Sequence, residues 1–113
     1  MALAGAVGHV TTLIVAFEKQ ADTTTEELRD HYHEEHVPLV NEVPNLQGYE
    51  VTFPRDSEES PFDAVARLEF DGPAAMGEAM DTEAAAAMQE DAANFVAEGS
   101  MVQLVGETED VLE

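Results

Sequence analysis

The sequence contains no cysteine, very few basic residues and no long apolar run. The absence of cysteine excludes disulfides, thiolate metal sites and a cysteine nucleophile. No apolar stretch approaches the length of a membrane span, and the small residues at 1–8 lack the basic start of a signal peptide. We therefore expect a cytoplasmic protein that has no membrane partner.

Charge is almost all of one sign. Four lysines and arginines stand against 25 aspartates and glutamates, which gives a formal net charge of −21 at pH 7. Such a surface repels phosphate groups, so nucleic acids and anionic membranes are poor partners. The acids are spread along the whole chain, and this composition resembles that of proteins from the high-salt cytoplasm of halophiles. We expect a halophilic source; the alternative is an ordinary acidic protein.

The length of 113 residues suits one domain, and a hydrophobic fraction of 44% suffices for one core. We expect a single domain over residues 1–113, with a loose leader at 1–8 and an acidic tail at 108–113. The expected strands are 9–17, 47–53, 62–70 and 101–107, and the expected helices are 25–43, with a break near residue 38, and 73–98, with a bend near residue 81.

This order of strand, helix, strand, strand, helix and strand predicts a ferredoxin-like α+β fold. In it, two helices cover one face of a four-stranded antiparallel sheet. The strand at 9–17 is apolar on both faces in its second half, which favours a central position. The uncovered sheet face would expose apolar side chains at a cost, so we expect a second copy to cover it in a homodimer.

The first helix carries the most specific pattern. Thr23 and Thr24 each precede a glutamate by three residues, which predicts two overlapping capping boxes. Pro38 cannot donate to the helical ladder and predicts a kink or break. At 100° per residue, one apolar arc collects Leu28, Tyr32, His36, Leu39 and Val43.

His36 lies on that arc, one turn beyond Tyr32, and is the strongest catalytic candidate. A neutral imidazole could accept a proton from an enolisable or phenolic ligand, with Tyr32 as donor or orienting group. In the alternative interpretation, His36 is a buried histidine that bonds a backbone carbonyl and stabilises the kink at Pro38. Desolvation should keep its ring neutral at pH 7 unless a carboxylate lies nearby.

Three neighbouring histidines raise the question of a metal. Only His33 and His36 lie near enough on the helical wheel to share an ion, and His31 points elsewhere. Two ligands are too few for a closed site, so we predict no metal and a hydrated surface for His31 and His33.

Further residues could line a pocket. Tyr49 and His9 lie on expected strands and could face a ligand, although packing or exposure at an edge is the favoured interpretation of each. Small or flexible apolar residues recur at spacing four in the second helix, as Met76, Met80, Ala84, Met88 and Ala92. They predict core packing first, and they would also suit a flexible apolar ligand.

The chain resembles the EthD family of dimeric α+β barrels from residue 9 to residue 107. The residues that carry the resemblance are Glu27, Leu28, Tyr32, His36, Pro38, Leu39, Pro44, Leu46, Tyr49, Phe62, Asp63, Val65, Ala66, Phe70, Asp91, Asn94 and Phe95. Two positions depart from the family pattern, because Tyr32 stands where a tryptophan is usual and Arg67 where many relatives carry a glutamate.

The resemblance implies two sheets that face each other as an eight-stranded barrel, and a small pocket between sheet and helices. We expect a small apolar or aromatic metabolite, no cofactor, and chemistry of the oxidoreductase, isomerase or cyclase type with His36 as acid/base and Tyr32 as its partner. The expected ligand contacts are Tyr49, His9, Leu39 and Phe95. The alternative function is a non-catalytic ligand-binding or stabilising accessory dimer in a catabolic pathway.

Overall fold

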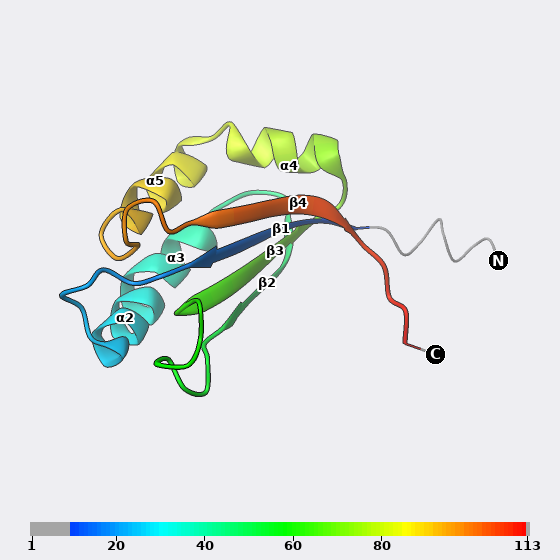
Figure 1. The fold of residues 1–113 in the computed structure, drawn as a ribbon. Coiled ribbons are helices and arrows are strands. Elements are labelled where there is room, and N and C mark those ends of the chain that lie inside the picture. Colours follow the sequence, from blue (N-terminus) through cyan, green and yellow to red (C-terminus); the bar gives the residue numbers. More distant parts are fainter. Residues whose placement is uncertain (1–9, 113) are drawn as a thin grey trace.

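Figure 1 shows a four-stranded sheet with helices on one face, in a computed structural model that describes residues 10–112. The elements in chain order are β1 (Val10–Phe17), α2 (Thr25–His31), the π-helix η1 (Tyr32–His36), α3 (Val37–Val40), β2 (Leu46–Thr52), β3 (Ala64–Phe70), α4 (Pro73–Met80), α5 (Glu83–Ala92) and β4 (Val102–Thr108). The strand order is β2-β3-β1-β4, and all neighbours are antiparallel. The predicted ferredoxin-like α+β fold is confirmed.

β1 lies in the interior of the sheet, between β3 and β4, as its apolar sequence predicts. On β3, every second residue faces the helices and is buried, and the residues between them stay partly exposed. The buried set is Ala64, Ala66, Leu68 and Phe70. The period of two in the sequence therefore separates a covered face from an uncovered one.

The first helix begins at Thr25, behind the cap residue Thr24. The Oγ1 atom of Thr24 accepts a hydrogen bond from the Glu27 N–H at 3.1 Å, and Glu27 Oε1 accepts one from the Thr24 N–H at 2.9 Å. The second predicted capping box does not form, because Thr23 closes a turn in which its N–H bonds to Gln20 O at 3.0 Å. One capping box therefore sets the start of the helix.

The break predicted at Pro38 takes the form of a wide helical turn. Over η1 the helix accommodates one extra residue, and the N–H of Val37 bonds to the carbonyl of Tyr32, five residues back. Pro38 follows directly, and α3 continues to Val40. The helix ends three residues before the predicted residue 43, and Asn45 reverses the chain with a φ of 66°.

The second helical segment bends at residue 81, as predicted, and divides into α4 and α5. Thr82 caps α5, since its Oγ1 accepts a hydrogen bond from the Ala85 N–H at 3.1 Å. This cap restarts the helix at a new angle after the bend.

The expectation that this helix continues to residues 98–99 is wrong, because α5 ends at Ala92. Beyond it the chain folds back against the end of β1, where the Gln20 N–H bonds to Phe95 O at 3.0 Å. Gly99 belongs to a later turn, in which its φ of 80° suits glycine. Backbone pairing outside the helix thus outweighs the local helical pattern.

β4 differs from the other strands because its side chains are exposed on both faces. It extends to Thr108, one residue beyond its predicted end, and Thr108 Oγ1 hydrogen-bonds to Thr12 Oγ1 at 2.5 Å. Thr108 therefore belongs to the sheet, and the acidic tail starts one residue later than expected.

The sheet face without helices, called the bare face below, mixes apolar and charged side chains. Its apolar members include Ile14, Val65, Val102 and Leu104. Arg67 lies on the same face and pairs within the chain, with Glu50 at 3.3 Å and Glu69 at 3.0 Å. Within residues 10–112, no helix is long and apolar enough to cross a membrane.

Candidate functional site

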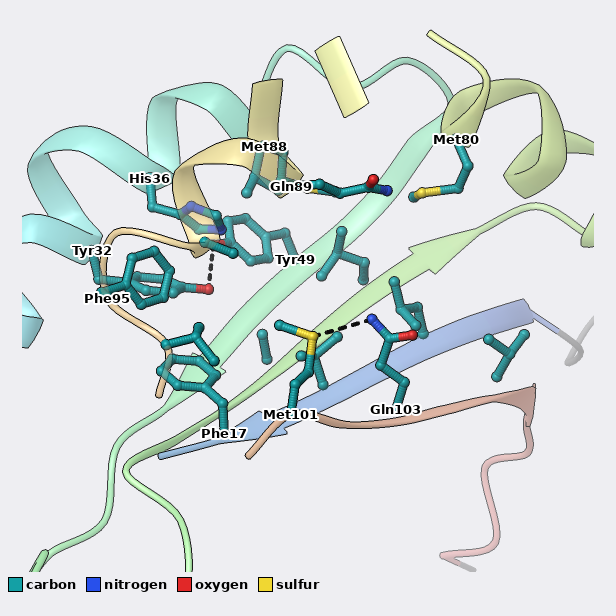
Figure 2. A pocket seen from close by; sticks show the side chains of 18 of the residues that line it. Phe17, Tyr32, His36, Tyr49, Met80, Met88, Gln89, Phe95, Met101 and Gln103 are labelled. Carbon is teal, nitrogen blue, oxygen red and sulfur yellow. Dashed lines mark hydrogen bonds between the residues drawn. The ribbon is translucent and has the colours of Figure 1, made fainter. Parts of the chain in front are cut away.

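A cavity of about 490 Å³ lies between the sheet and the helices. Figure 2 shows its wall, to which all four strands contribute, as do η1, α3, α4 and α5. Its size falls within the range of small-molecule sites. The cavity is the place where the predicted site residues can be compared with the structure.

Four of the six predicted site residues line this cavity: His36, Tyr32, Tyr49 and Phe95. Leu39 does not line it; the side chain is half-buried, and the neighbouring Val40 takes its place in the wall. His9 lies outside the described residues.

The wide turn explains the exchange of Leu39 for Val40. The buried residues of the first helix recur every four positions, as Leu28, Tyr32, His36 and Val40. In a regular α-helix, steps of four drift by about 40° each and soon leave the buried face. The extra residue in η1 reduces this drift, so Val40 points inward.

The carboxylate of Asp91, on α5, is the hydrogen-bond centre of the site. It accepts from His36 Nδ1 at 2.9 Å, from His31 Nε2 at 3.0 Å and from Asn94 Nδ2 at 3.1 Å. Its side chain is 10% exposed. A buried carboxylate with three donors is a strong anchor for the rings that it contacts.

The pairing of the histidines differs from the prediction. His31 and His36 share Asp91, and neither ring pairs with His33, which lies exposed beside Phe53. Residues five apart point in different directions on an α-helix, but a turn with hydrogen bonds five residues apart brings them to one side. The expectation that His31 points elsewhere is therefore wrong.

The pKa directions define the protonation states of the pair. Burial alone would raise the pKa of Asp91, but the hydrogen bonds from His36, Asn94 and His31 outweigh it and lower the pKa. Burial lowers the pKa of His36, and the hydrogen bond and charge of Asp91 only partly offset this effect. At pH 7, Asp91 is ionised and His36 is neutral.

An ionised carboxylate only accepts hydrogen bonds, so Nδ1 of His36 carries the ring proton and Nε2 has a free lone pair. Among the described residues, no hydrogen bond reaches this Nε2 atom, and no fully buried side-chain nitrogen or oxygen lacks a partner. Nε2 is therefore open to the cavity. The interpretation in which His36 bonds a backbone carbonyl does not hold. Its Nδ1 atom bonds to the carboxylate of Asp91, and no described backbone carbonyl bonds to Nε2.

Two phenols lie beside the histidine. The Tyr49 hydroxyl donates to the Tyr32 hydroxyl at 2.6 Å, and the rings of Tyr32 and His36 lie 5.0 Å apart. Burial, followed by the influence of Tyr49, raises the pKa of Tyr32, and burial also raises the pKa of Tyr49. Both phenols therefore remain protonated donors across the physiological pH range.

The remainder of the wall is largely apolar. Met76, Met80 and Met88 come from the second helical segment, as the spacing of the methionines suggested. Two exposed amides, Gln89 on α5 and Gln103 on β4, also border the cavity, and Gln103 Nε2 lies 3.4 Å from the sulfur of Met101. The arrangement places a base and phenolic donors at the side of an apolar chamber.

No group of three histidine, aspartate or glutamate side chains suited to a metal ion occurs in the part of the chain that the structure describes. Sequence reasoning missed the role of Asp91. Its position contributes to the EthD resemblance together with Asn94 and Phe95, and that was the available signal. Its partner could not be inferred, because 55 residues separate it from His36.

Comparisons with known proteins agree with this architecture. The sequence model of the EthD domain matches residues 20–99. A search of curated proteins finds no match. An EthD family protein from Bacillus halodurans C-125 is 27% identical, with a TM-score of 0.76 over 88% of this chain and 98% of that chain.

More distant solved structures share the fold. A dimeric ferredoxin-like protein of unknown function from Thermobifida fusca YX is 15% identical, with a TM-score of 0.72 over 90% of this chain and 93% of that one. A hydroxynitrile lyase from Passiflora edulis is 12% identical, with a TM-score of 0.71 over 92% of this chain and 97% of that one.

Proposed function

Because the chain belongs to the EthD family, we propose that it is a homodimeric enzyme that moves a proton on a small apolar or aromatic metabolite bound in the cavity. His36 is the acid/base, Asp91 orients it, and Tyr32 is the hydrogen-bond donor to the ligand, with its own hydroxyl accepting from Tyr49. One observation carries the proposal: His36 lines the cavity, Asp91 holds its Nδ1 atom at 2.9 Å, and no described residue hydrogen-bonds its Nε2 atom.

The proposed step is the enolisation of a bound ketone. Nε2 of His36 takes the proton from the carbon beside the carbonyl. The electron pair of the C–H bond forms the new C=C bond, and the π pair of the carbonyl moves to its oxygen. Asp91 stabilises the imidazolium through Nδ1, and the phenol pair provides the donor for the developing oxyanion. Return of the proton to another atom of the ligand gives isomerisation. Attack of the enolate carbon on a second carbonyl of the same ligand, whose oxygen then takes the proton from His36, gives ring closure. Neither route requires an oxidant or a cofactor.

The apolar wall supports the step in two ways. It surrounds the buried His36 ring with side chains of low polarity, which strengthens the interaction of the developing charges with Asp91 and the phenols. An apolar wall also favours neutral ligands over charged ones, and the surface around it, with a net charge of −21, repels anions. The lyase from Passiflora edulis shows that at least one protein of this fold is an enzyme.

Exchange of α-protons in acetophenone tests the proposal. Nuclear magnetic resonance in D2O would follow the exchange for wild type, for His36→Asn and for His33→Asn. Asparagine keeps a donor near the Nδ1 position, so that Asp91 stays paired, but it offers no base in place of Nε2. We expect His36→Asn to slow exchange by about 10²-fold or more, and the exposed His33→Asn to leave it unchanged.

The pH profile sharpens this test. The pKa of His36 is lowered from its usual 6.5, so exchange should persist as the pH falls below 6.5 and then fail as the ring takes up a proton. Equal exchange in wild type and His36→Asn would contradict the proposal. If acetophenone also bound equally to both, the accessory ligand-binding function would remain.

The dimer is the second part of the proposal. The bare face exposes 55% of Val102 and 61% of Leu104, and structurally similar proteins are described as dimeric. Two sheets that pack through these faces would bury the apolar side chains and form the eight-stranded barrel.

Light scattering at high salt tests the assembly. We expect a dimer for wild type, a monomer for Leu104→Asp on the bare face, and a dimer for the control Ala86→Asp on the exposed side of α5. A wild-type monomer at micromolar concentration would rule out the barrel.

A further inference from the structure

The cavity has two chemically different ends. Figure 2 shows Phe17, Tyr32, His36 and Phe95 gathered at one end, here called the aromatic end. Met80 lies at the other end, here called the methionine end, and Met76, one turn earlier on α4, packs against the same apolar cluster as Met80. A ligand that fills the whole cavity therefore contacts aromatic rings and polar atoms at one end and thioethers at the other.

The aromatic end is rigid and contains the titratable groups. The ring of Phe95 contacts His36 at 4.9 Å edge-on and Tyr32 at 5.7 Å between centroids, and Asp91 holds the histidine from behind. These edge-to-face contacts line the aromatic end with both faces and edges of rings. Because aromatic rings pack well against other rings, this end suits a planar, ring-sized group with one oxygen for Tyr32 or for Nε2 of His36.

The methionine end has the opposite character. Thioether side chains are unbranched and adapt their shape to a flexible partner. Met76 and Met80 come from α4, and the buried Met88 from α5 extends the same wall. Leu13 and Leu68 from the sheet belong to the same apolar cluster as these methionines. These contacts favour a flexible hydrocarbon over a second ring or a charge.

The cavity opens along β4. Val105 of β4 and Met101, which directly precedes the strand, line the cavity and are 55% and 38% exposed. The neutral amides Gln89 and Gln103 flank the same opening. The site is therefore a trough that runs from the aromatic end to the methionine end, with a neutral rim in an otherwise anionic surface.

We propose that the trough binds neutral amphiphiles that carry a planar, oxygen-bearing head at the aromatic end and an unbranched alkyl tail that extends to Met80. This specificity rests on the proposed function for the orientation of the head, which must bring its oxygen to His36 and the phenols. The tail contacts are independent of that chemistry.

Each methylene that leaves water on binding should tighten the complex by about two- to fourfold, the lower value applying where the trough is open. Affinity should rise with tail length until the tail passes Met80, and then level off. A carboxylate at the head should prevent binding, because the nearest charged group is the anionic Asp91.

Titration calorimetry with phenol, 4-ethylphenol, 4-butylphenol and 4-hexylphenol tests the proposal, with hexanoate as the charged probe. For wild type we expect rising affinity along the series and no binding of hexanoate. Met80→Asp should remove the gain for the longer tails and leave phenol binding unchanged. Ala86→Asp adds the same charge on the exposed side of α5 and should behave as wild type.

A second variant protects the test from misfolding. Val105→Asp lies on the opposite wall, and its side chain is 55% exposed, so the strand tolerates the substitution more readily. It should likewise remove the rise in affinity from phenol to 4-hexylphenol. Two results would overturn the tail proposal: wild-type affinity that does not rise with tail length, or a rise in affinity that is the same in both variants as in wild type.

The calorimetric test of the tail and the exchange test of the proposed function can fail independently of each other. A flat series together with His36-dependent exchange of acetophenone would leave proton transfer standing and refute the tail. A rising series with exchange that ignores His36→Asn would leave the tail standing and refute the base.

Discussion

The two helical segments lie side by side on the helix face of the sheet and line one cavity with very different chemistry. The segment α2-η1-α3 is capped, contains a wide turn and presents His31, Tyr32 and His36. The segment α4-α5 is rich in alanine and methionine, and its one essential polar contribution to the site is Asp91. The contrast teaches that a conspicuous pattern on one element can depend on a single inconspicuous carboxylate on another.

The segments also differ in how they bury their residues. In the first, every fourth side chain points inward because the wide turn holds the face in line. In the second, the bend at residue 81 divides the face between two short helices, which buries Ala79, Ala85 and Met88. The first segment therefore sets which side chains point into the cavity at its aromatic end, and the second segment extends the wall toward the methionine end.

The largest effect should come from the contact between the segments. Asp91→Ala leaves His31, His36 and Asn94 without their shared acceptor and should lower the free energy of unfolding by about 2–4 kcal/mol. Chemical denaturation measures the loss. Glu90→Ala, at the exposed neighbouring position, is the control and should change little. A wild-type transition for Asp91→Ala would mean that the segments hold together without the carboxylate.

Salt should act on both segments together. The charge of −21 repels itself in the folded state, and screening should raise stability by roughly 2 kcal/mol between dilute and molar KCl. Thermal melts measure the gain, and a matched series in sucrose separates screening from general exclusion. A melting temperature that is flat in KCl would remove the halophilic interpretation of the composition.

Alkaline pH should break the first segment before the second. The folded pKa of Tyr32 is raised above its ordinary value of 10.0, so the unfolded chain loses this proton first. The stabilisation is complete below pH 10 and declines above it, by about 1.4 kcal/mol per pH unit for each phenol. The chain has two tyrosines and no tryptophan, so tyrosinate absorbance reports on them alone. Absorbance that develops near pH 10 in the native protein would contradict the burial of the phenol.

The start of the first segment gives the smallest effect. Thr24→Ala removes the cap of α2 and should cost about 1 kcal/mol of unfolding free energy. Thr23→Ala is the matched control, because the structure assigns it no part in the capping box. Equal losses for the two variants would show that both overlapping boxes operate in solution.

Much of the architecture follows from local sequence. Alternation on β3, the apolar centre of β1, the Thr24 cap and the bend at residue 81 all appear in the structure as predicted. These features depend on neighbours within a few residues, so a local pattern suffices to predict them. The inward position of His36 follows in the same way from the arc that it shares with Tyr32.

Only the tertiary structure decided which side chains form hydrogen bonds with each other and which ones line the cavity. The wide turn placed Val40 instead of Leu39 in the wall, and packing of α5 against η1 brought Asp91 to His36. Residues far apart in sequence meet only when segments pack, and no local periodicity records which donor will find which acceptor. The sequence determined the elements and the candidate base; the packing determined the protonation state of that base and the shape of its cavity.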